Sequence, residues 1–323
     1  MGYVIRQTPC SPTELGGSSA SRGGGAAGFP FPAKPLFHPP SSGPFLCFLR
    51  PPIRSGRRNN GSKYWDKFYK RHNNKFFKDR HYLEKDWGSY FSQESDDASS
   101  SGKVVLEVGC GAGNTVYPLL AGFPGLFVHA CDFSPEAISL VKSHKDFNTD
   151  RINAFVCDVT KDDLTDKILP SSVDILTLVF VLSAVSPEKM HFILRNAKKV
   201  LKVPMGCVLL RDYAVGDFAQ AKLESKNQAI GENFYVRGDG TYSYFFSQDM
   251  MLNLFRDSGY NNLDINVYCK QIENRSRGVT MERRWIRAIF SSIDNVQEVN
   301  WNHKPTPLTH VKGMCSIIRY HLP

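Results

Sequence analysis

One segment of the chain, residues 104–114, most narrows the range of folds that it can adopt. Its sequence, VVLEVGCGAGN, begins as an apolar β-strand and runs into a glycine-rich turn, and a helix is predicted from Thr115 onward. The glycines let the backbone pass close to a ligand, and the start of the helix offers free N–H groups. The spacing is G-x-G-x-G, and Asn114 stands where a dinucleotide-binding G-x-G-x-x-G turn has its last glycine. A Rossmann dehydrogenase is therefore disfavoured.

Three acidic residues are placed in order around this turn. Glu107 stands two positions before the first glycine, and Asp132 and Asp158 end the next two predicted strands. A carboxylate at Asp132 can accept hydrogen bonds from both hydroxyls of a ribose, which suits NAD as well as S-adenosylmethionine (AdoMet). Asp158 is placed to meet an adenine amino group, which NAD enzymes do not regularly require. Each aspartate alone could be a helix cap, but the ordered set predicts an AdoMet site that also includes Gly109, Gly111 and Gly113.

Strands alternate with helices through the middle of the chain, which predicts a doubly wound α/β sheet. The predicted strands are 103–108, 126–131, 153–157, 173–180, 206–212, 263–269 and 284–290, and the predicted helices lie near 114–121, 135–144, 187–202 and 247–258. The last two strands have no helix between them and fit an antiparallel hairpin at one edge. The expected fold is a seven-stranded, mostly parallel, Rossmann-like sheet.

At 323 residues the chain can bury one large core and still carry appendages. Residues 1–60, rich in Pro, Gly and Ser, are expected to be a disordered leader or a transit peptide. Residues 61–102 form an aromatic and basic segment with a linker, residues 103–290 the main domain, and residues 291–323 a tail without a recognisable pattern. A cytoplasmic location is expected, with a mitochondrion or plastid as the alternative because the leader is poor in acids.

The net charge of +9 is unevenly distributed. Residues 1–60 carry +6, residues 61–91 and 270–290 carry +4 each, and the rest of the chain carries −5. Basic flanks of this kind suit a polyanion, and the aromatic residues interleaved with residues 61–91 favour nucleic acid over plain solvated charge. Among those aromatics, Trp65 and Tyr69 fall at helical spacing, which predicts a helical lid.

The eight cysteines include no C-x-x-C pair and no His/Cys cluster at metal-ligand spacing, so no metal is expected. Cys110, Cys131 and Cys157 lie in or beside predicted strands and are expected to be reduced core thiols. No apolar stretch is long enough to span a membrane.

The end of the fourth predicted strand excludes two chemistries. Residues 178–187, LVFVLSAVSP, contain neither the D/N-P-P-Y/F clamp used to methylate amino nitrogens of adenine nor the Pro-Cys nucleophile used on carbon 5 of pyrimidines. Val179 and Phe180 are expected either to wall an adenine or to fill the core.

The fifth predicted strand ends in the triplet Arg211-Asp212-Tyr213. In an open α/β sheet this end faces the ligand cleft, so the triplet is a candidate catalytic group, with an internal ion pair as the alternative. Residues 231–246 follow as an insertion crowded with aromatic residues, and loops placed in this way usually carry the acceptor site.

With these segments in view, the chain resembles the tRNA 3-methylcytidine methyltransferases of the methyltransferase-like group, which are class I AdoMet-dependent enzymes. The resemblance covers about residues 62–290 and rests on WDKFYKR, NKFFKDRHYLEKDW, LEVGCGAGNT, ACDFSPEAI, CDVTKDDL, FVLSAVSPEKM, LLRDYAVGDFA, ENFYVRGDGTYSYFF and MERRWIRAIF. It implies methylation of N3 of a cytidine at position 32, in the anticodon loop of tRNA, with an aminoacyl-tRNA synthetase or another helper protein as a candidate second partner.

The resemblance also implies roles for individual residues. The implied AdoMet contacts, besides the glycine turn and Glu107, are Trp65, Tyr69, Asp132, Asp158, Val159 and Val179. The residues implied to line the acceptor pocket or hold tRNA are Lys78, Asp79, Arg80, Arg211, Asp212, Asn233, Tyr235 and Arg237. The chain departs from the family where a Lys-Pro-Gly-Gly turn is usual, since residues 202–207 read KVPMGC.

The chemistry expected of such an enzyme is simple. N3 of cytosine already carries a lone pair, so no general base is needed. The rate enhancement is expected to come from placing N3 in line with the methyl–sulfur bond of AdoMet. Methylated N3 is cationic, so a nearby acid, for which Asp212 is the candidate, would stabilise the developing charge. Two alternatives stay open: a methyltransferase acting on a small molecule, which would not bind tRNA, and a non-catalytic partner subunit, which would not bind AdoMet.

Overall fold

The computed structural model describes residues 3–7, 61–92, 102–274 and 278–293. Most of the predicted leader and linker, and the tail from residue 294 onward, lie outside these ranges. Within them, no helix has the length and apolar character needed to cross a bilayer.

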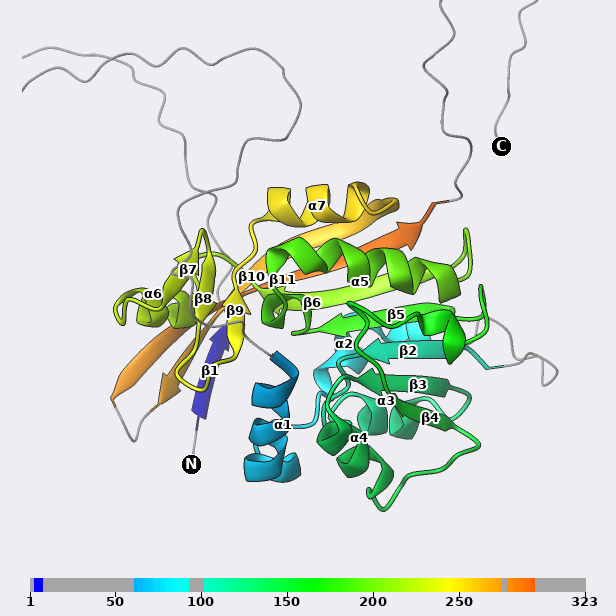
Figure 1. The fold of residues 1–323 in the computed structure, drawn as a ribbon. Coiled ribbons are helices and arrows are strands. Elements are labelled where there is room, and N and C mark those ends of the chain that lie inside the picture. The colour runs from blue at the N-terminus through cyan, green and yellow to red at the C-terminus, as the bar shows by residue number, and fades with distance from the viewer. Residues whose placement is uncertain (1–2, 8–60, 93–101, 275–277, 294–323) are drawn as a thin grey trace, which may run out of the picture. The chain divides into compact units, whose positions relative to one another are not determined.

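The seven predicted strands form one sheet (Figure 1). Its five central strands are parallel, in the order β6-β5-β2-β3-β4, and β11 and β10 continue it antiparallel beyond β6. Their bounds are β2 Val104–Val108, β3 Phe127–Asp132, β4 Ile152–Val156, β5 Ile175–Val179, β6 Cys207–Tyr213, β10 Tyr260–Asn274 and β11 Val279–Ser292. The predicted fold class is confirmed. An eighth strand, β1 (Tyr3–Gln7), which the sequence did not predict, lies antiparallel beside β10.

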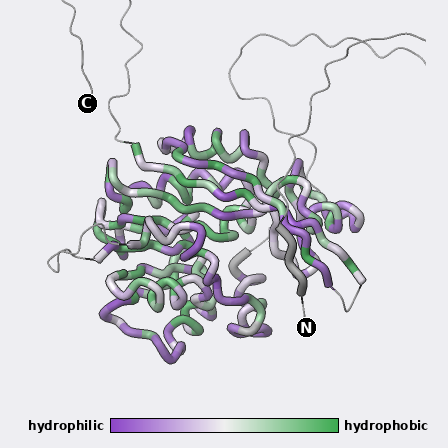
Figure 2. The backbone as a smooth tube through the Cα atoms, turned by 180° about the vertical axis from the view of Figure 1, so that it is seen from behind, coloured by the Kyte–Doolittle hydropathy of each residue, from purple (hydrophilic) through white to green (hydrophobic). Residues whose placement is uncertain are grey.

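Helices cover both faces of the sheet because its strands are apolar on both sides; Figure 2 shows the central strands as mostly hydrophobic. In β2, Val105 packs in one core cluster and Leu106 in the other. The Leu106 side is covered by α5 (Pro187–Val200) and α7 (Gln248–Arg256). The Val105 side is covered by α2 (Tyr82–Phe91), α3 (Val116–Gly122) and α4 (Pro135–Lys142). Cys110, Cys131 and Cys157 are buried free thiols, as predicted.

The order in which strands are added to the sheet reverses at β2, since β3 lies on one side of it and β5 on the other. Ligands of open α/β sheets bind at such a switch point, beyond the carboxyl ends of the strands. The glycine turn after β2 and the acids after β3 and β4 all lie at this edge.

Two additions flank that edge. The predicted lid helix is α1 (Gly61–His72), followed by a short turn, η1 (Asn73–Lys75). Asp66 of α1 accepts a hydrogen bond of 2.5 Å from the Ser134 hydroxyl at the start of α4, which fixes the helix to the core. The insertion after β6 contains α6 (Phe218–Glu224) and a small antiparallel sheet of β7 (Ala229–Gly231), β8 (Phe234–Val236) and β9 (Tyr242–Tyr244).

Asp217 ties the insertion to the large sheet. Its buried carboxylate caps α6 by accepting from Ala219 N at 2.7 Å, accepts from the backbone N–H of Arg284 in β11 at 2.7 Å, and pairs with Arg283 Nε at 2.9 Å. One side chain thus satisfies groups of α6 and of two neighbouring β11 residues.

We expect Asp217→Ala to lower the free energy of unfolding by about 3–5 kcal/mol, because it leaves Arg283 without its buried partner. Urea denaturation would measure the change. Asp257→Ala is the matched control, since its carboxylate lies 3.3 Å from Arg256 but about 70% exposed, and its loss should change stability by less than about 0.5 kcal/mol. Equal effects of the two substitutions would contradict this account of Asp217.

Candidate active site

The glycine turn between β2 and α3 has the backbone that its sequence predicts. Gly109, Gly111 and Gly113 have φ values of +66°, +55° and +86°, in the left-handed region that favours glycine. A Cβ on Gly111 would lie 2.6 Å from the Tyr69 hydroxyl, and a Cβ on Gly109 would lie 2.8 Å from a methyl group of Val181. The turn is therefore pressed between the lid helix and the loop after β5.

Asp132 lies at the end of β3 with its carboxylate turned toward this turn. It is buried, and it accepts hydrogen bonds from Gly111 N at 3.0 Å and from Ser134 N at 2.9 Å. Burial raises the pKa of Asp132 to about 6, although these two hydrogen bonds oppose the shift. The residue is therefore held in one orientation and is largely ionised at neutral pH.

Glu107 is the most unusual group at the site. Its side chain is 1% exposed, and neither carboxylate oxygen has a hydrogen-bond partner among the residues that the structure describes. Burial raises its pKa to about 7, opposed by the positive charge of Arg80, whose Nη1 lies 3.8 Å away. A buried carboxylate that accepts no hydrogen bond is costly even with a cation nearby, and a cationic ligand would offset that cost. AdoMet carries a sulfonium and an ammonium group, so these residues fit it.

The remaining predicted cofactor residues lie at the same edge but differ in whether their side chains are available to a ligand. Val179 and Val159 are buried in the two core clusters. The Asp158 side chain is 25% exposed and is engaged within its own loop, where it pairs with Lys161 and accepts from the Thr160 hydroxyl at 2.6 Å. Burial raises its pKa, but these hydrogen bonds outweigh it and leave the pKa below its usual range. A ligand would have to compete with Lys161 for this carboxylate.

The lid helix brings its two predicted residues to the glycine turn. Tyr69 is buried above Gly111, and the Trp65 ring lies 6.0 Å from the Tyr69 ring. The opposite end of α1 reaches the insertion, because a Cβ on Gly240 would lie 2.4 Å from the ring of Tyr64. The helix therefore spans from the glycine turn to the insertion.

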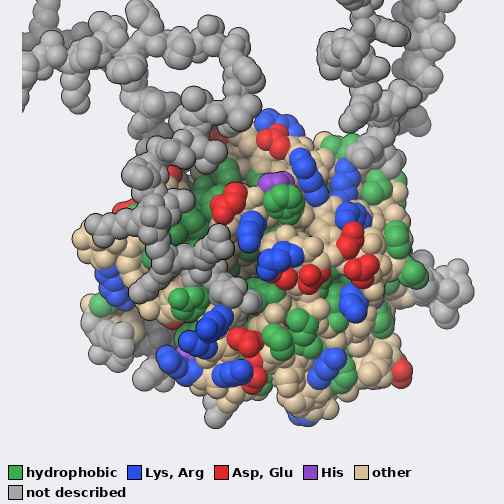
Figure 3. Space-filling model, viewed as in Figure 1, with side chains coloured by type: hydrophobic (Ala, Val, Ile, Leu, Met, Phe, Trp, Pro, Cys, Tyr) green, Lys and Arg blue, Asp and Glu red, His purple; other side chains and the backbone are tan. Residues whose placement is uncertain are grey.

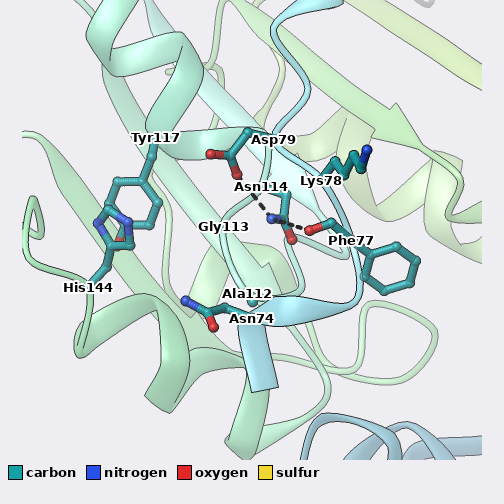
Figure 4. Close-up of a pocket in the computed structure, with 9 residues that line it drawn as sticks. All are labelled: Asn74, Phe77, Lys78, Asp79, Ala112, Gly113, Asn114, Tyr117 and His144. Atoms are coloured by element: carbon teal, nitrogen blue, oxygen red, sulfur yellow. Dashed lines mark hydrogen bonds between the residues drawn. The ribbon is translucent and has the colours of Figure 1, made fainter. Parts of the chain in front are cut away.

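Lys78, Asp79 and Arg80 lie on the outer side of the glycine turn. Arg80 N donates to Asn114 O at 2.8 Å, and Asn114 Nδ2 donates to Asp79 at 3.1 Å and to the Phe77 carbonyl at 3.2 Å (Figure 4). This strip borders a cavity of about 310 Å³ that is lined by Asn74, Phe77, Lys78, Asp79, Ala112, Gly113, Asn114, Tyr117 and His144.

Arg80 has a further role that its neighbours lack. Its Nη1 donates to the Thr115 hydroxyl at 3.0 Å, near Glu107, and its guanidinium lies 5.7 Å from the centre of the Phe180 ring. Phe180 follows β5 and has a φ of +59°, which is a strained value for a bulky residue and common at functional sites. The sequence predicted Phe180 only as an adenine wall or a core residue. It did not predict the positive φ angle.

The structure does not keep the Arg211-Asp212-Tyr213 triplet together, because side chains alternate across a strand. The Arg211 Nη1 lies 2.7 Å from Asp86 of α2, and its guanidinium lies 3.9 Å from the centre of the Tyr82 ring. Arg211 therefore forms the internal ion pair that the sequence left as an alternative. It is absent from the surroundings of Asp212.

Asp212 is fully buried beside the loop after β5. It accepts from Ser183 N at 3.0 Å and from Tyr213 N at 2.9 Å. Burial raises its pKa to about 6, while these hydrogen bonds and the charge of Arg237 oppose the shift. The carboxylate is therefore mostly ionised at neutral pH.

An aromatic wall stands next to Asp212. The Tyr213 ring lies 4.9 Å from the Phe180 ring and 5.7 Å from the Phe245 ring, and the Arg237 guanidinium lies 5.7 Å from the Tyr213 ring. Arg283, which the sequence placed only within a basic flank, lies 5.8 Å from the same ring. Rings and guanidinium groups in this arrangement can stack a planar base.

Asn233 and Tyr235 hold the insertion together. The Tyr235 hydroxyl is buried and donates to Glu224 of α6 at 2.6 Å, and Gln220 Nε2 donates to both Tyr235 and Asn233. Of the three residues predicted in this insertion, Arg237 lies against Tyr213 of the aromatic wall, and Tyr235 contacts the wall only through Phe245, with ring centres 5.5 Å apart. Within the described ranges no group of three or more His, Cys, Asp or Glu side chains is placed to hold a metal ion.

Comparison with known proteins agrees with this geometry. A family model described as "Methyltransferase domain" matches residues 106–207. The tRNA N(3)-cytidine methyltransferase METTL6 of Homo sapiens is 44% identical over 229 residues, which cover 71% of this chain and 79% of that protein. The tRNA N(3)-methylcytidine methyltransferase trm141 of Schizosaccharomyces pombe is 38% identical, covering 73% of this chain and 94% of that protein. The tRNA N(3)-cytidine methyltransferase METTL2 of Xenopus tropicalis is 39% identical, covering 72% and 78%.

We expect the affinity for AdoMet to depend on the ionisation of Glu107. As the pH falls through about 7, the carboxyl takes up a proton and loses its attraction for a cation. Between about pH 8 and about pH 6.5 the affinity should fall about fourfold, since each unit below a pKa costs tenfold. Calorimetry would measure this. Glu107→Gln should bind more weakly at pH 8 and lose most of the pH dependence; an unchanged profile in this variant would exclude Glu107 as its source.

We expect Arg211→Ala to affect stability and not cofactor binding. The substitution removes an ion pair and a cation–π contact that are largely screened from water, at a cost of about 2–3 kcal/mol in unfolding free energy. Arg211→Lys keeps the charge without the planar group and should recover only part of it. Urea denaturation and AdoMet calorimetry on both variants are the measurements. Weaker AdoMet binding with normal stability would show instead that Arg211 reaches the site.

Proposed function

Since the chain belongs to the tRNA N(3)-cytidine methyltransferase family, we propose that it transfers the methyl group of AdoMet to N3 of a cytidine in the anticodon loop of tRNA, at position 32. One observation carries this proposal: the glycine turn with Glu107 and the wall of Phe180, Tyr213 and Arg237 lie at the same edge of the sheet, and Arg80 contacts both. A cofactor site and a surface suited to a flat base are thereby joined.

Each half of the site has its own task in this proposal. When bound, AdoMet supplies an electrophilic methyl group. Glu107 attracts its positive charge, Asp132 accepts from the ribose hydroxyls, and Tyr69 closes the glycine turn from the lid side and keeps water out. The aromatic wall holds the cytosine ring so that the N3 lone pair points at the methyl group, and this placement is the main source of rate.

Asp212 is the proposed electrostatic residue. N3 becomes cationic as the bond forms, and a fixed negative charge nearby favours that state over the neutral ground state. The positive charge of Arg237 acts on Asp212, and the Arg237 guanidinium lies 5.7 Å from the Tyr213 ring, so we place the Asp212 carboxylate close to the wall that would hold the base. Asp212 acts through its field and takes up no proton.

The chemistry of the acceptor supports a location in a loop. N3 of cytosine is occupied by pairing inside a duplex, so the target must be unpaired or turned out of its stack. A cytidine in the anticodon loop meets this requirement at low cost. A helper protein such as an aminoacyl-tRNA synthetase is a candidate second partner, because it could present one set of tRNAs to the enzyme.

Incubation with total tRNA and methyl-labelled AdoMet, followed by nucleoside mass spectrometry, tests the proposal. We expect label in 3-methylcytidine, and fragment mapping should place it at position 32. The assay is run with and without added synthetase. Label recovered only in small molecules would support a metabolite methyltransferase, and AdoMet binding without any transfer under either condition would support a non-catalytic subunit.

We expect Asp212→Asn to lower kcat about 10²–10³-fold, the scale on which one preorganised electrostatic partner acts. AdoMet and tRNA affinities should change little, because the stabilisation is confined to the transition state. Asn also presents an N–H₂ group to a backbone N–H of Ser183 or Tyr213, so stability must be measured alongside. A variant that unfolds more easily but turns over normally would make Asp212 a structural residue.

A further inference from the structure

Six aromatic side chains form a continuous cluster along α1 and the two residues that follow η1. Neighbouring ring centres lie 4.7 to 6.0 Å apart across Trp65, Phe68, Tyr69, His72, Phe76 and Phe77. At the inner end, the buried Tyr69 covers Gly111 in the cofactor turn. At the outer end, Phe76 is 56% exposed although three other rings hold it in place. A large ring that is both fixed and exposed is a surface prepared for stacking.

The surroundings of Phe76 indicate what it stacks. The exposed side chains of α1 include Lys63, Lys67, Lys70 and Arg71, and Lys78 is exposed two residues beyond Phe76. Figure 3 shows Lys and Arg side chains gathered over this helix. An exposed aromatic ring on a segment that carries several exposed cations fits an unpaired nucleobase with its phosphates, since the base takes the ring face and the cations take the backbone. This charge suits an apolar protein partner poorly.

We propose that Phe76 is a stacking platform for an unpaired base of the substrate RNA, distinct from the methylated cytosine, and that this contact and the cofactor stabilise the same aromatic cluster. The inference rests on the proposed function for the identity of the RNA. In this proposal the base packs on the outer end of the cluster and AdoMet lies beneath its inner end. When one ligand restricts the motion of the rings, the other ligand binds with a smaller loss of conformational entropy. Linkage requires the effect to be reciprocal.

The test uses a hairpin RNA with an unpaired loop that carries 2-aminopurine, whose fluorescence falls when it stacks, and S-adenosylhomocysteine as a cofactor that cannot react. Phe76→Ala should weaken hairpin binding by about 5- to 150-fold, the range that one lost base–aromatic stack gives, and should abolish quenching at one loop position. Phe76→Trp should retain both. Phe192→Ala is the matched control, because that phenylalanine is 51% exposed on α5, and it should bind like the wild type.

Cofactor binding distinguishes the loss of a direct contact between Phe76 and RNA from a general disturbance of the packing of α1. S-adenosylhomocysteine should bind Phe76→Ala about as well as the wild type when RNA is absent. Its tightening by RNA, present in the wild type, should be lost. A loss of cofactor affinity without RNA, equal to the loss of RNA affinity, would make Phe76 a structural member of the lid and overturn the proposal.

The two proposals fail in different ways. Wild-type protein that quenches the probe but forms no 3-methylcytidine would contradict the proposed function and leave the stacking intact. Normal methylation by Phe76→Ala, with normal hairpin affinity and quenching, would overturn the stacking and leave the function intact. Quenching lost equally in Phe192→Ala would also overturn it, because the effect would then not belong to this cluster.

Discussion

The buried negative charge of Glu107 is the constraint on which the rest of the site depends. Two carboxylates, Glu107 and Asp132, lie around one glycine turn, and burial raises the pKa of both. Asp132 is satisfied by two backbone N–H groups, whereas the burial of Glu107 is opposed by the Arg80 guanidinium 3.8 Å away and, more weakly, by the Thr115 side chain. Removing an ion from water costs several kcal/mol, so this arrangement is retained at the expense of stability. A cationic ligand is the simplest compensation.

The segment from α1 to Arg80 supplies the cation that lies beside Glu107. Arg80 reaches Glu107 because residues 77–80 are held along the glycine turn. The backbone of Arg80, the Phe77 carbonyl and the Asp79 carboxylate all form hydrogen bonds with Asn114. The preceding helix is fixed independently by Asp66 on the start of α4 and by Tyr69 on Gly111. Disturbing either attachment should therefore alter the electrostatics of the cofactor turn as well as its cover. These attachments are the route by which the proposed contact at the far end of the aromatic cluster would influence cofactor affinity.

The parts of the molecule that the sequence predicted share a physical origin. The five parallel strands are short, mainly apolar runs that end at a glycine, an acid or a turn, the apolar parts of β10 and β11 are interleaved with polar residues, and α1 has apolar residues on one helical face, so local patterns determine them. Helix α6 and strands β7–β9 are too short for any periodicity to show. The separation of Arg211 from Asp212 follows from strand alternation and could have been predicted. The partner of Arg211 could not, because Asp86 lies 125 residues earlier in the chain. The strained backbone of Phe180 likewise depends on packing between Arg80 and Tyr213.

The same electrostatic logic accounts for both halves of the proposed reaction. Methyl transfer to a neutral nitrogen moves a positive charge from the cofactor side of the site to the base. In the proposed site, Glu107 and Asp132 are near the first position and Asp212 is near the second, and all three are buried with pKa values raised to about 6 or 7. In each case a neighbouring group opposes the rise in pKa and keeps the acid ionised. This group is Arg80 for Glu107, backbone N–H groups for Asp132, and both backbone N–H groups and Arg237 for Asp212. Deeper burial without these partners would protonate the acids at neutral pH and remove the field, while greater exposure would let water screen it. The site therefore requires acids that are desolvated and yet still charged, and the arginines and backbone N–H groups beside them make that combination possible.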